Sequence, residues 1–252
     1  MNETAAIARV WIGSQRLLFA GVLPDLLDWH RHSFHCVLLA PTDAFEVEDA
    51  HGAHRCRALL VRGGVAHRLH FTGQQMVTHY IAPHDPHFAA LAAPGEQAVA
   101  PVPWHHGWSA ALARWFDARD AGALRDVIHE TWAPAQPAGL DRRVRRMAQR
   151  FAEGEGLADP PAALAADVGL SGSRLAHLVK AQTGSSIGEV QRGYKFSHAA
   201  RSMVAAPTFT RAAHAAHFAD SAHFSRAFRA AYGIAPSRIL IRSTRWVMSD
   251  RL

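Results

Sequence analysis

Two stretches in the last hundred residues repeat one helical pattern, and this duplication constrains the fold more than any other feature. Residues 164–184 read LAADVGLSGSRLAHLVKAQTG, and residues 212–233 read AAHAAHFADSAHFSRAFRAAYG. In each copy a short apolar segment and a turn precede a longer amphipathic segment that ends at a glycine, Gly184 or Gly233. Apolar residues three and four positions apart are typical of a helix with one face on a core. The sequence therefore predicts two helix-turn-helix units about 48 residues apart.

The long helix predicted in the second repeat has clear start and stop signals and two distinct faces. Asp220 or Ser221 is suited to cap its start, and Gly233 with Pro236 marks its stop. The expected buried stripe consists of Phe224, Ala227, Phe228, Ala231 and Tyr232. Two arginines lie off the stripe, three positions apart, and are expected to point outward together. They are Arg226 and Arg229.

Charge is distributed unevenly along the chain. The net charge is +6. Residues 1–138 hold 10 Lys and Arg against 13 Asp and Glu, a charge of −3, whereas residues 139–252 hold 17 against 8, a charge of +9. A compact basic unit joined to a mildly acidic one indicates a nucleic-acid-binding domain with a separate partner domain.

The first half reads as β-structure. Short apolar runs alternate with turn signals over residues 5–91: LLFAGVL, FHCVLLA, ALLVRGG and MVTHYIA. Proline and glycine interrupt residues 133–141, which indicates a linker. We therefore expect an α+β protein with a β-barrel or sandwich at residues 1–107 and helices at 108–132. A linker at 133–140 and an all-helical unit at 141–252 follow. The 108–132 segment is equally suited to dimerisation and to covering the barrel.

The basic half resembles the DNA-binding domain of AraC-type transcriptional regulators. The stretches LAADVGLSGSRLAHLVKAQTGSSI and HFSRAFRAAYGIAP carry the resemblance. It implies seven helices, with a central helix near residues 188–205, and it places helices 173–183 and 221–232 in successive major-groove faces of one duplex. The DNA-binding residues it implies, together with their neighbours, are Ser173, Arg174, Ala176, His177, Lys180, Ser221, Ala222, His223, Arg226 and Arg229.

Two departures from the family pattern stand out. His217-Phe218 occupies the place where Gly-Phe usually opens the second turn, so a positive φ there would carry some strain. Ile239-Leu240 replaces a common aromatic-arginine pair after Pro236, which predicts weaker phosphate contact by the closing helix.

Histidines in the first half resemble the metal-site pattern of cupin barrels, which many AraC-type regulators carry as effector domains. His30 and His32 share one strand face, and His67 follows a Gly-Gly turn. The resemblance implies effector binding by these three residues, with a divalent metal, an organic ligand or a purely structural role left open. The usual carboxylate is missing, and His35, a candidate substitute, falls on the opposite strand face.

These observations predict a DNA-binding transcription regulator, an activator by family tendency, controlled by a small-molecule or metal effector. Its expected partners are double-stranded DNA, the effector, RNA polymerase and a second copy of the chain. The alternative is a metal-dependent cupin enzyme, dioxygenase-like or isomerase-like, fused to a DNA-binding domain. A third hypothesis, an architectural DNA binder, leaves the first half unexplained. No catalytic residues are identified, and a divalent metal is the one cofactor candidate. Two cysteines and no apolar spanning segment predict a cytoplasmic protein rather than a membrane one.

Overall fold

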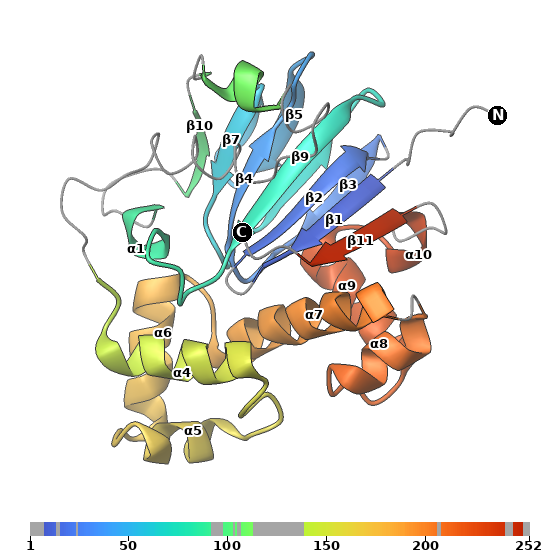
Figure 1. Cartoon of the computed structure of the whole chain (residues 1–252). Coiled ribbons are helices and arrows are strands. Elements are labelled where there is room, and N and C mark those ends of the chain that lie inside the picture. The colour runs from blue at the N-terminus through green and yellow to red at the C-terminus, as the bar shows by residue number, and fades with distance from the viewer. Residues whose placement is uncertain are drawn as a thin grey trace.

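The computed structural model describes residues 8–13, 16–23, 25–91, 98–102, 104, 107–112, 139–205, 208–239 and 244–248. Within these ranges the chain forms two facing β-sheets, with the C-terminal helices beneath them (Figure 1). None of the described helices combines the length and the hydropathy needed to cross a bilayer.

The larger sheet has seven strands in the order β10-β7-β4-β9-β2-β1-β11. Its members are β1 (Ala8–Ile12), β2 (Arg16–Val22), β4 (His35–Leu39), β7 (Ala58–Val61), β9 (Gln75–Ile81), β10 (Val99–Pro101) and β11 (Thr244–Met248). The smaller sheet has the order β3-β8-β5-β6. Its members are β3 (Leu26–His30), β5 (Phe45–Asp49), β6 (Gly52–Cys56) and β8 (His67–His70). Four of these strands, β2, β4, β7 and β9, arise from the four predicted apolar runs.

The middle of the seven-stranded sheet is buried on both faces, which explains the near-continuous apolar sequence of its central strands. All five residues of β4 are buried. Successive side chains alternate in direction, so that Cys36 and Leu38 enter the core between the sheets while Val37 and Leu39 enter a second core outside it. That outer core includes Phe88 from α1 (Phe88–Leu91).

The predicted helical segment at 108–132 is described as far as residue 112. Trp108, Ala111 and Leu112 pack in the outer core of the large sheet. These residues therefore cover the sandwich, and residues 113–132 lie outside the described part of the chain.

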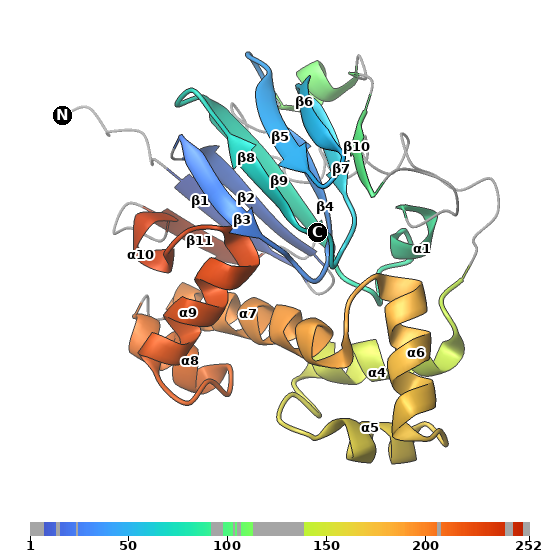
Figure 2. The same ribbon diagram turned by 180° about the vertical axis from the view of Figure 1, so that it is seen from behind.

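Seven helices are described after residue 140. They are α4 (Arg142–Glu153), α5 (Pro161–Asp167), α6 (Gly172–Thr183), α7 (Ile187–Ala205), α8 (Phe209–Ala215), α9 (Ser221–Tyr232) and α10 (Pro236–Ile239). The pairs α5–α6 and α8–α9 are the two predicted helix-turn-helix units, and α7 is the predicted central helix. Figures 1 and 2 show α4, α5 and α6 at one end of α7 and α8, α9 and α10 at the other. The expected fold class is confirmed.

One element differs from the prediction of helix throughout residues 141–252. Residues 244–248 form β11, which pairs in parallel with β1, with Val10 opposite Trp246. The last described segment of the chain therefore completes the sheet that the first described segment begins. Parallel pairing joins distant segments of the chain, so local sequence patterns carry no signal for it.

Candidate functional site

The two long helices of the helix-turn-helix units share the same construction. In α6 the Ser171 side chain accepts from the Arg174 N–H, and in α9 the Asp220 side chain accepts from the His223 N–H. Both helices end at a glycine in the left-handed conformation, Gly184 at φ 71° and Gly233 at φ 73°. Side-chain capping and a left-handed glycine satisfy the free backbone groups at helix ends. The caps predicted for α9 are confirmed for Asp220 and Gly233.

Side chains proposed to contact DNA lie on the exposed faces of these helices. Leu175 and Val179 of α6, and Phe224 and Ala231 of α9, are buried in the cores below. All ten predicted DNA-binding residues are exposed except Ser221, which is half-buried. The structure therefore leaves the predicted contact faces accessible, five residues from each unit.

Two of these cations already have intramolecular neighbours. The Lys180 ammonium donates to the Gly184 carbonyl at 2.6 Å, at the C-terminal end of its own helix. The Arg229 guanidinium lies 4.0 Å from the Asp28 carboxylate, and both side chains are more than half exposed. An exposed ion pair such as Arg229–Asp28 is worth about 0–1 kcal/mol, so a phosphate group can displace it.

The turn of the second unit contains the strain that the sequence predicted. His217 has φ 56° and is the non-glycine residue with positive φ among those that the structure describes. The left-handed conformation costs a residue with a Cβ roughly 1–2 kcal/mol. Glycine avoids this cost, but ordering its more flexible backbone on folding costs about 0.5–1 kcal/mol more than for alanine.

We expect His217→Gly to raise the free energy of unfolding by up to about 1 kcal/mol, because it removes the Cβ clash at this φ. Urea unfolding followed by circular dichroism measures the change. His217→Ala is the matched control, since it removes the imidazole but keeps the Cβ. A glycine variant no more stable than the alanine variant would contradict the strain.

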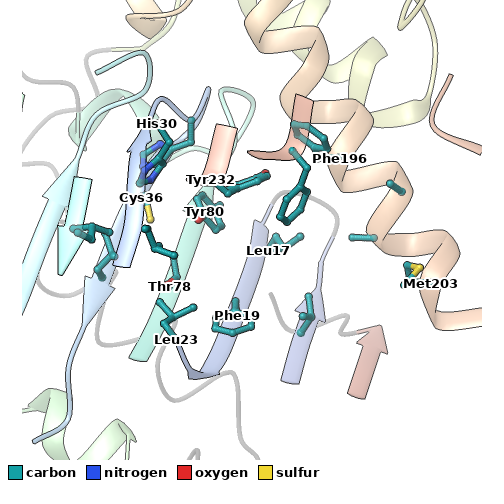
Figure 3. Close-up of a pocket in the computed structure, with 18 of the residues that line it drawn as sticks. Leu17, Phe19, Leu23, His30, Cys36, Thr78, Tyr80, Phe196, Met203 and Tyr232 are labelled. Atoms are coloured by element: carbon teal, nitrogen blue, oxygen red, sulfur yellow. The ribbon is translucent and has the colours of Figure 1, made fainter. Parts of the chain in front are cut away.

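A cavity of about 870 Å³ lies between the sandwich and the helices, and part of this volume is open to solvent. Figure 3 shows side chains from both parts of the chain around it. The sandwich contributes apolar side chains with Thr78, Tyr80 and three histidines, whereas the helical part contributes Phe196, Ala199, Ala200, Met203, Phe224, Phe228 and Tyr232. Trp246 of β11 completes the described lining. No Lys, Arg, Asp or Glu is among these lining residues.

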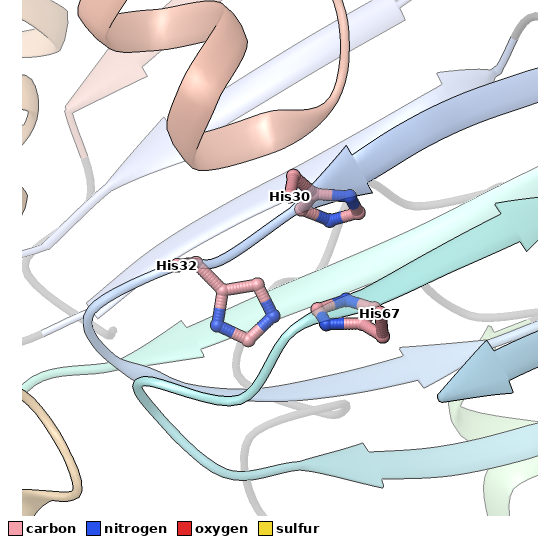
Figure 4. Close-up of side chains that lie close together, drawn as sticks. All are labelled: His30, His32 and His67. Atoms are coloured by element: carbon pink, nitrogen blue, oxygen red, sulfur yellow. The ribbon is translucent and has the colours of Figure 1, made fainter. Parts of the chain in front are cut away.

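The three predicted effector histidines come together at this cavity. Figure 4 shows His30, His32 and His67 facing one another. The ring centroids are 4.2 Å apart for His30 and His67, 4.9 Å for His32 and His67, and 6.0 Å for His30 and His32. Burial lowers the pKa of His30 to about 4 and that of His32 to about 3, and it holds the pKa of His67 well below the usual range. All three rings are therefore neutral at pH 7.

His35 does not join this cluster. It stacks on Phe88 at 3.8 Å between ring centroids, on the outer face of the large sheet. Its Nδ1 accepts from the Gly63 N–H at 2.9 Å. His35 therefore does not replace the missing carboxylate, and its predicted position on the opposite strand face is confirmed.

Helices α6 and α9 each contact the sandwich at the glycine that ends the helix. The Asp28 N–H donates to the Gly233 carbonyl at 3.1 Å, and the Arg31 N–H donates to the Ala230 carbonyl at 3.2 Å. A Cβ on Gly233 would overlap the Asp28 backbone oxygen and lie 2.8 Å from the His30 Nδ1. Strand β3 therefore fits against the end of α9 with no room for a side chain.

The end of α6 meets a different loop in the same way. A Cβ on Gly184 would overlap the Gly63 carbonyl oxygen, and one on Gly64 would overlap the Gly184 oxygen. Gly64 donates its N–H to the His32 carbonyl at 2.8 Å, and His67 follows it by three residues. Each helix end thus contacts a segment that also carries a cavity histidine.

Further bonds join the segment after His32 to the α6–α7 junction and to α7. The Ser33 hydroxyl donates to the Glu189 carbonyl at 2.5 Å, and the Ser185 hydroxyl donates to the Ser33 carbonyl at 3.2 Å. The Phe34 ring packs edge-on against Tyr194 of α7 at 5.0 Å between centroids. Residues 28–34 therefore contact both α9 of the second unit and the start of α7, directly after the first unit.

Sequence reasoning missed the contribution of the helical part to the cavity. Phe228 and Tyr232 were predicted as core residues of the second unit, and they pack in the cores of both the second unit and the sandwich. The excess of aromatic residues on α9 was the available signal, because a helix of this length needs fewer to pack on its own unit.

Comparison with known proteins agrees with this architecture. Residues 164–242 match the family model described as a helix-turn-helix domain. A search of curated proteins finds no match to the chain.

Solved structures of ToxT from Vibrio cholerae share the fold of nearly the whole chain. An apo ToxT variant aligns with a TM-score of 0.65 and 10% identity, covering 91% of this chain and 98% of that one. ToxT bound to (E)-4-(8-methylnaphthalen-1-yl)but-3-enoic acid aligns at 0.62 and 10%, over 90% and 97%. Wild-type ToxT bound to an unsaturated fatty acid aligns at 0.57 and 10%, over 95% and 97%. At this identity the likeness is one of fold.

Proposed function

We propose that this chain, an AraC-type regulator by its paired helix-turn-helix units and its ToxT-like fold, controls transcription in response to an apolar small molecule. The molecule binds in the cavity between the sandwich and the helices, and its presence changes how α6 and α9 engage DNA. The shared lining of that cavity is the observation that carries the proposal, because a ligand there contacts both parts of the chain at once.

The exposed residues of α6 and α9 are the proposed contact set for DNA. Arg226 is suited to bidentate hydrogen bonds with guanine, and the Ala176 methyl is suited to contact with a thymine methyl. Lys180 and Arg229 are assigned to phosphates, which set affinity more than sequence. Backbone N–H groups at the start of α9, near His223, are available to a further phosphate.

Residues 28–34 and 63–67 are the proposed route of control. Both segments place histidines in the cavity and backbone atoms on the end of a DNA-contacting helix. A ligand that displaces these histidines also displaces the docking surfaces of Gly184 and Gly233. The two helices would then shift relative to each other, and their spacing decides whether both fit successive grooves.

The ligand class follows from the lining. Aromatic and aliphatic side chains dominate it, and ToxT, which shares the fold, has been solved with an unsaturated fatty acid. We therefore assign an apolar effector with a small polar end that lies near His30, His32 and His67. The matched helix-turn-helix domain and the ToxT-like fold support a regulator, and no catalytic role is assigned.

The remaining partners follow from the role in transcription. RNA polymerase is the proposed partner in activation, and a second copy of the chain is the proposed dimer partner. The proposed location of the protein is the cytoplasm, where it has access to DNA. Sedimentation of the DNA-bound protein distinguishes one copy from two on each site.

We expect oleic acid to change the affinity of the protein for its preferred DNA by fivefold or more. A binding site is first selected from a random duplex pool, and fluorescence anisotropy then measures affinity with and without oleic acid. Ala200→Trp fills the cavity from α7 and is expected to abolish the response. Val247→Trp, on an exposed position of β11, is the matched control. Failure to select any sequence would contradict sequence-specific DNA binding. Binding of oleic acid without a change in DNA affinity would contradict regulation of DNA binding by the ligand.

A further inference from the structure

Two of the cavity histidines, His32 and His67, are fixed by the backbone as hydrogen-bond acceptors. The Nδ1 of His32 bonds to the Phe34 carbonyl oxygen at 2.8 Å, and the Nδ1 of His67 bonds to the Val65 carbonyl oxygen at 3.0 Å. A carbonyl oxygen only accepts, so in a neutral ring each Nδ1 carries the proton and each Nε2 keeps its lone pair. Both rings line the cavity and therefore offer it an acceptor.

Neither acceptor has a donor among the described residues. The Nε2 atoms of His32 and His67 are buried without a hydrogen-bond partner, and the two residues are 3% and 0% exposed. A buried polar atom without a partner costs free energy that a donor would restore. No Lys or Arg is among the described residues that line the cavity. We therefore expect the missing donors to come from the ligand.

The two acceptors lie close enough for one small head group to reach both. The ring centroids of His32 and His67 are 4.9 Å apart, and one nitrogen of each ring lies within 4.8 Å of a nitrogen of the other (Figure 4). Hydrogen bonds of about 2.8 Å from each side span such a gap. A single hydroxyl group has one hydrogen and bonds one ring only. Two hydroxyl groups on adjacent carbon atoms supply one hydrogen to each ring.

The same acceptors disfavour a charged head group. The oxygens of a carboxylate only accept, so they would place lone pairs and a negative charge against the lone pairs of the rings. An ammonium group has donors, but its buried charge would lack a carboxylate partner in the described lining. Hydroxyl groups supply donors without the cost of burying a charge.

We propose that the effector is an uncharged apolar molecule that ends in two adjacent hydroxyl groups, one donating to the Nε2 of His32 and the other to the Nε2 of His67. Alkane-1,2-diols and monoacylglycerols have this chemistry. The assignment rests on the proposed function, because it names the head group of the ligand in the same cavity. The tail lies among apolar side chains such as Phe19 and Met203 (Figure 3). Oleic acid fills that apolar part with its carboxylate toward the side open to solvent.

Compounds of similar length that differ in head group test the assignment on the full chain, after a chelator has removed any bound metal. Decane-1,2-diol has two hydroxyl groups, decan-1-ol has one, and the ether 1-methoxynonane has no donor. Isothermal titration calorimetry measures the affinity of each at neutral pH. The hydration of the free compounds cancels when the ratio of diol affinity to ether affinity is compared between protein variants.

His32→Phe and His67→Phe each remove one acceptor and keep an aromatic ring. We expect the ratio of diol affinity to ether affinity to fall about fivefold in each variant, because one hydrogen bond is lost. In the double variant we expect a fall of at least tenfold. Decan-1-ol can donate to the remaining histidine in either single variant, so its ratio to the ether is expected to fall in the double variant only.

His70→Phe is the matched control, because His70 lies on the same strand as His67 with opposite facing. Its ratio is expected to equal that of the wild type. Unchanged affinity for the ether shows that the cavity of a variant is intact. A ratio of diol to ether that is the same in the wild type and the double variant overturns the assignment.

Two further compounds keep the test decisive if a variant fails to fold. We expect decanoic acid and decylamine to bind the wild-type protein more weakly than decane-1,2-diol. Tighter binding of either compound overturns the uncharged diol head group. These outcomes leave the regulator proposal standing, because DNA is absent from the measurements. Binding of none of the compounds would instead contradict the cavity as the effector site and overturn both proposals.

Discussion

Gly184→Ala and Gly233→Ala are each expected to separate a DNA-contacting helix from the sandwich and to abolish the effect of oleic acid on DNA affinity. A Cβ at either position overlaps backbone atoms of the sandwich. Backbone cannot rotate away as a side chain can, so the docking must open. Fluorescence anisotropy on the selected DNA site, with and without oleic acid, measures the loss of response.

Gly169→Ala provides the matched control for both substitutions. Gly169 has φ +68°, close to +71° at Gly184 and +73° at Gly233, but a Cβ there has no neighbour within 4 Å. All three variants carry the left-handed penalty of roughly 1–2 kcal/mol. Gly184→Ala and Gly233→Ala add an overpacking cost of about 1–3 kcal/mol.

Urea unfolding separates these contributions. The difference between either docking variant and Gly169→Ala is the free energy of unfolding that the contact with the sandwich supplies. Docking variants that match Gly169→Ala in stability and still respond to oleic acid would contradict control through these helix ends.

Arg226→Ala is expected to weaken binding to the selected DNA site by about 1–3 kcal/mol and to relax sequence preference at one base position. Arg226 is exposed on α9, clear of the cavity, so the fold is expected to remain intact. Repeating the selection with the variant and measuring its affinity for single-base substitutions reveals the position.

Arg226→Lys and Arg55→Ala complete that experiment. Lysine keeps the charge but not the planar fork, so a base contact is lost in both Arg226 variants, whereas a phosphate contact survives in the lysine variant. Arg55 is an exposed arginine on β6 and reports the effect of net charge alone. An unchanged base preference in Arg226→Ala would remove this residue from the set that reads sequence.

The helical half could be predicted closely because its signals are local. The predicted helices 173–183 and 221–232 are α6 at Gly172–Thr183 and α9 at Ser221–Tyr232. Apolar spacing, polar caps and glycine stops all lie within a few residues of the helices that they define. The strain at His217 was predictable for the same reason, since one turn determines its backbone conformation.

The candidate site was predicted in part. Strand alternation grouped His30 with His32, and the resemblance to cupins added His67, but neither indicated that all three Nδ1 atoms bond to carbonyl groups. That property depends on the backbone conformation on either side of each histidine, since two acceptors precede their histidine and one follows it. The contribution of Phe196 and Tyr232 to the cavity depends on how two folded parts pack, which no local pattern records.

The pairing of β11 with β1 has a consequence for anyone who divides this protein. Because the last described strand pairs with the first described strand, cleavage between the two halves would leave a noncovalent complex rather than two free pieces. A fragment made from the second half alone would expose TRWVM as an unpaired strand that is prone to aggregate. Such a fragment is better ended after α10.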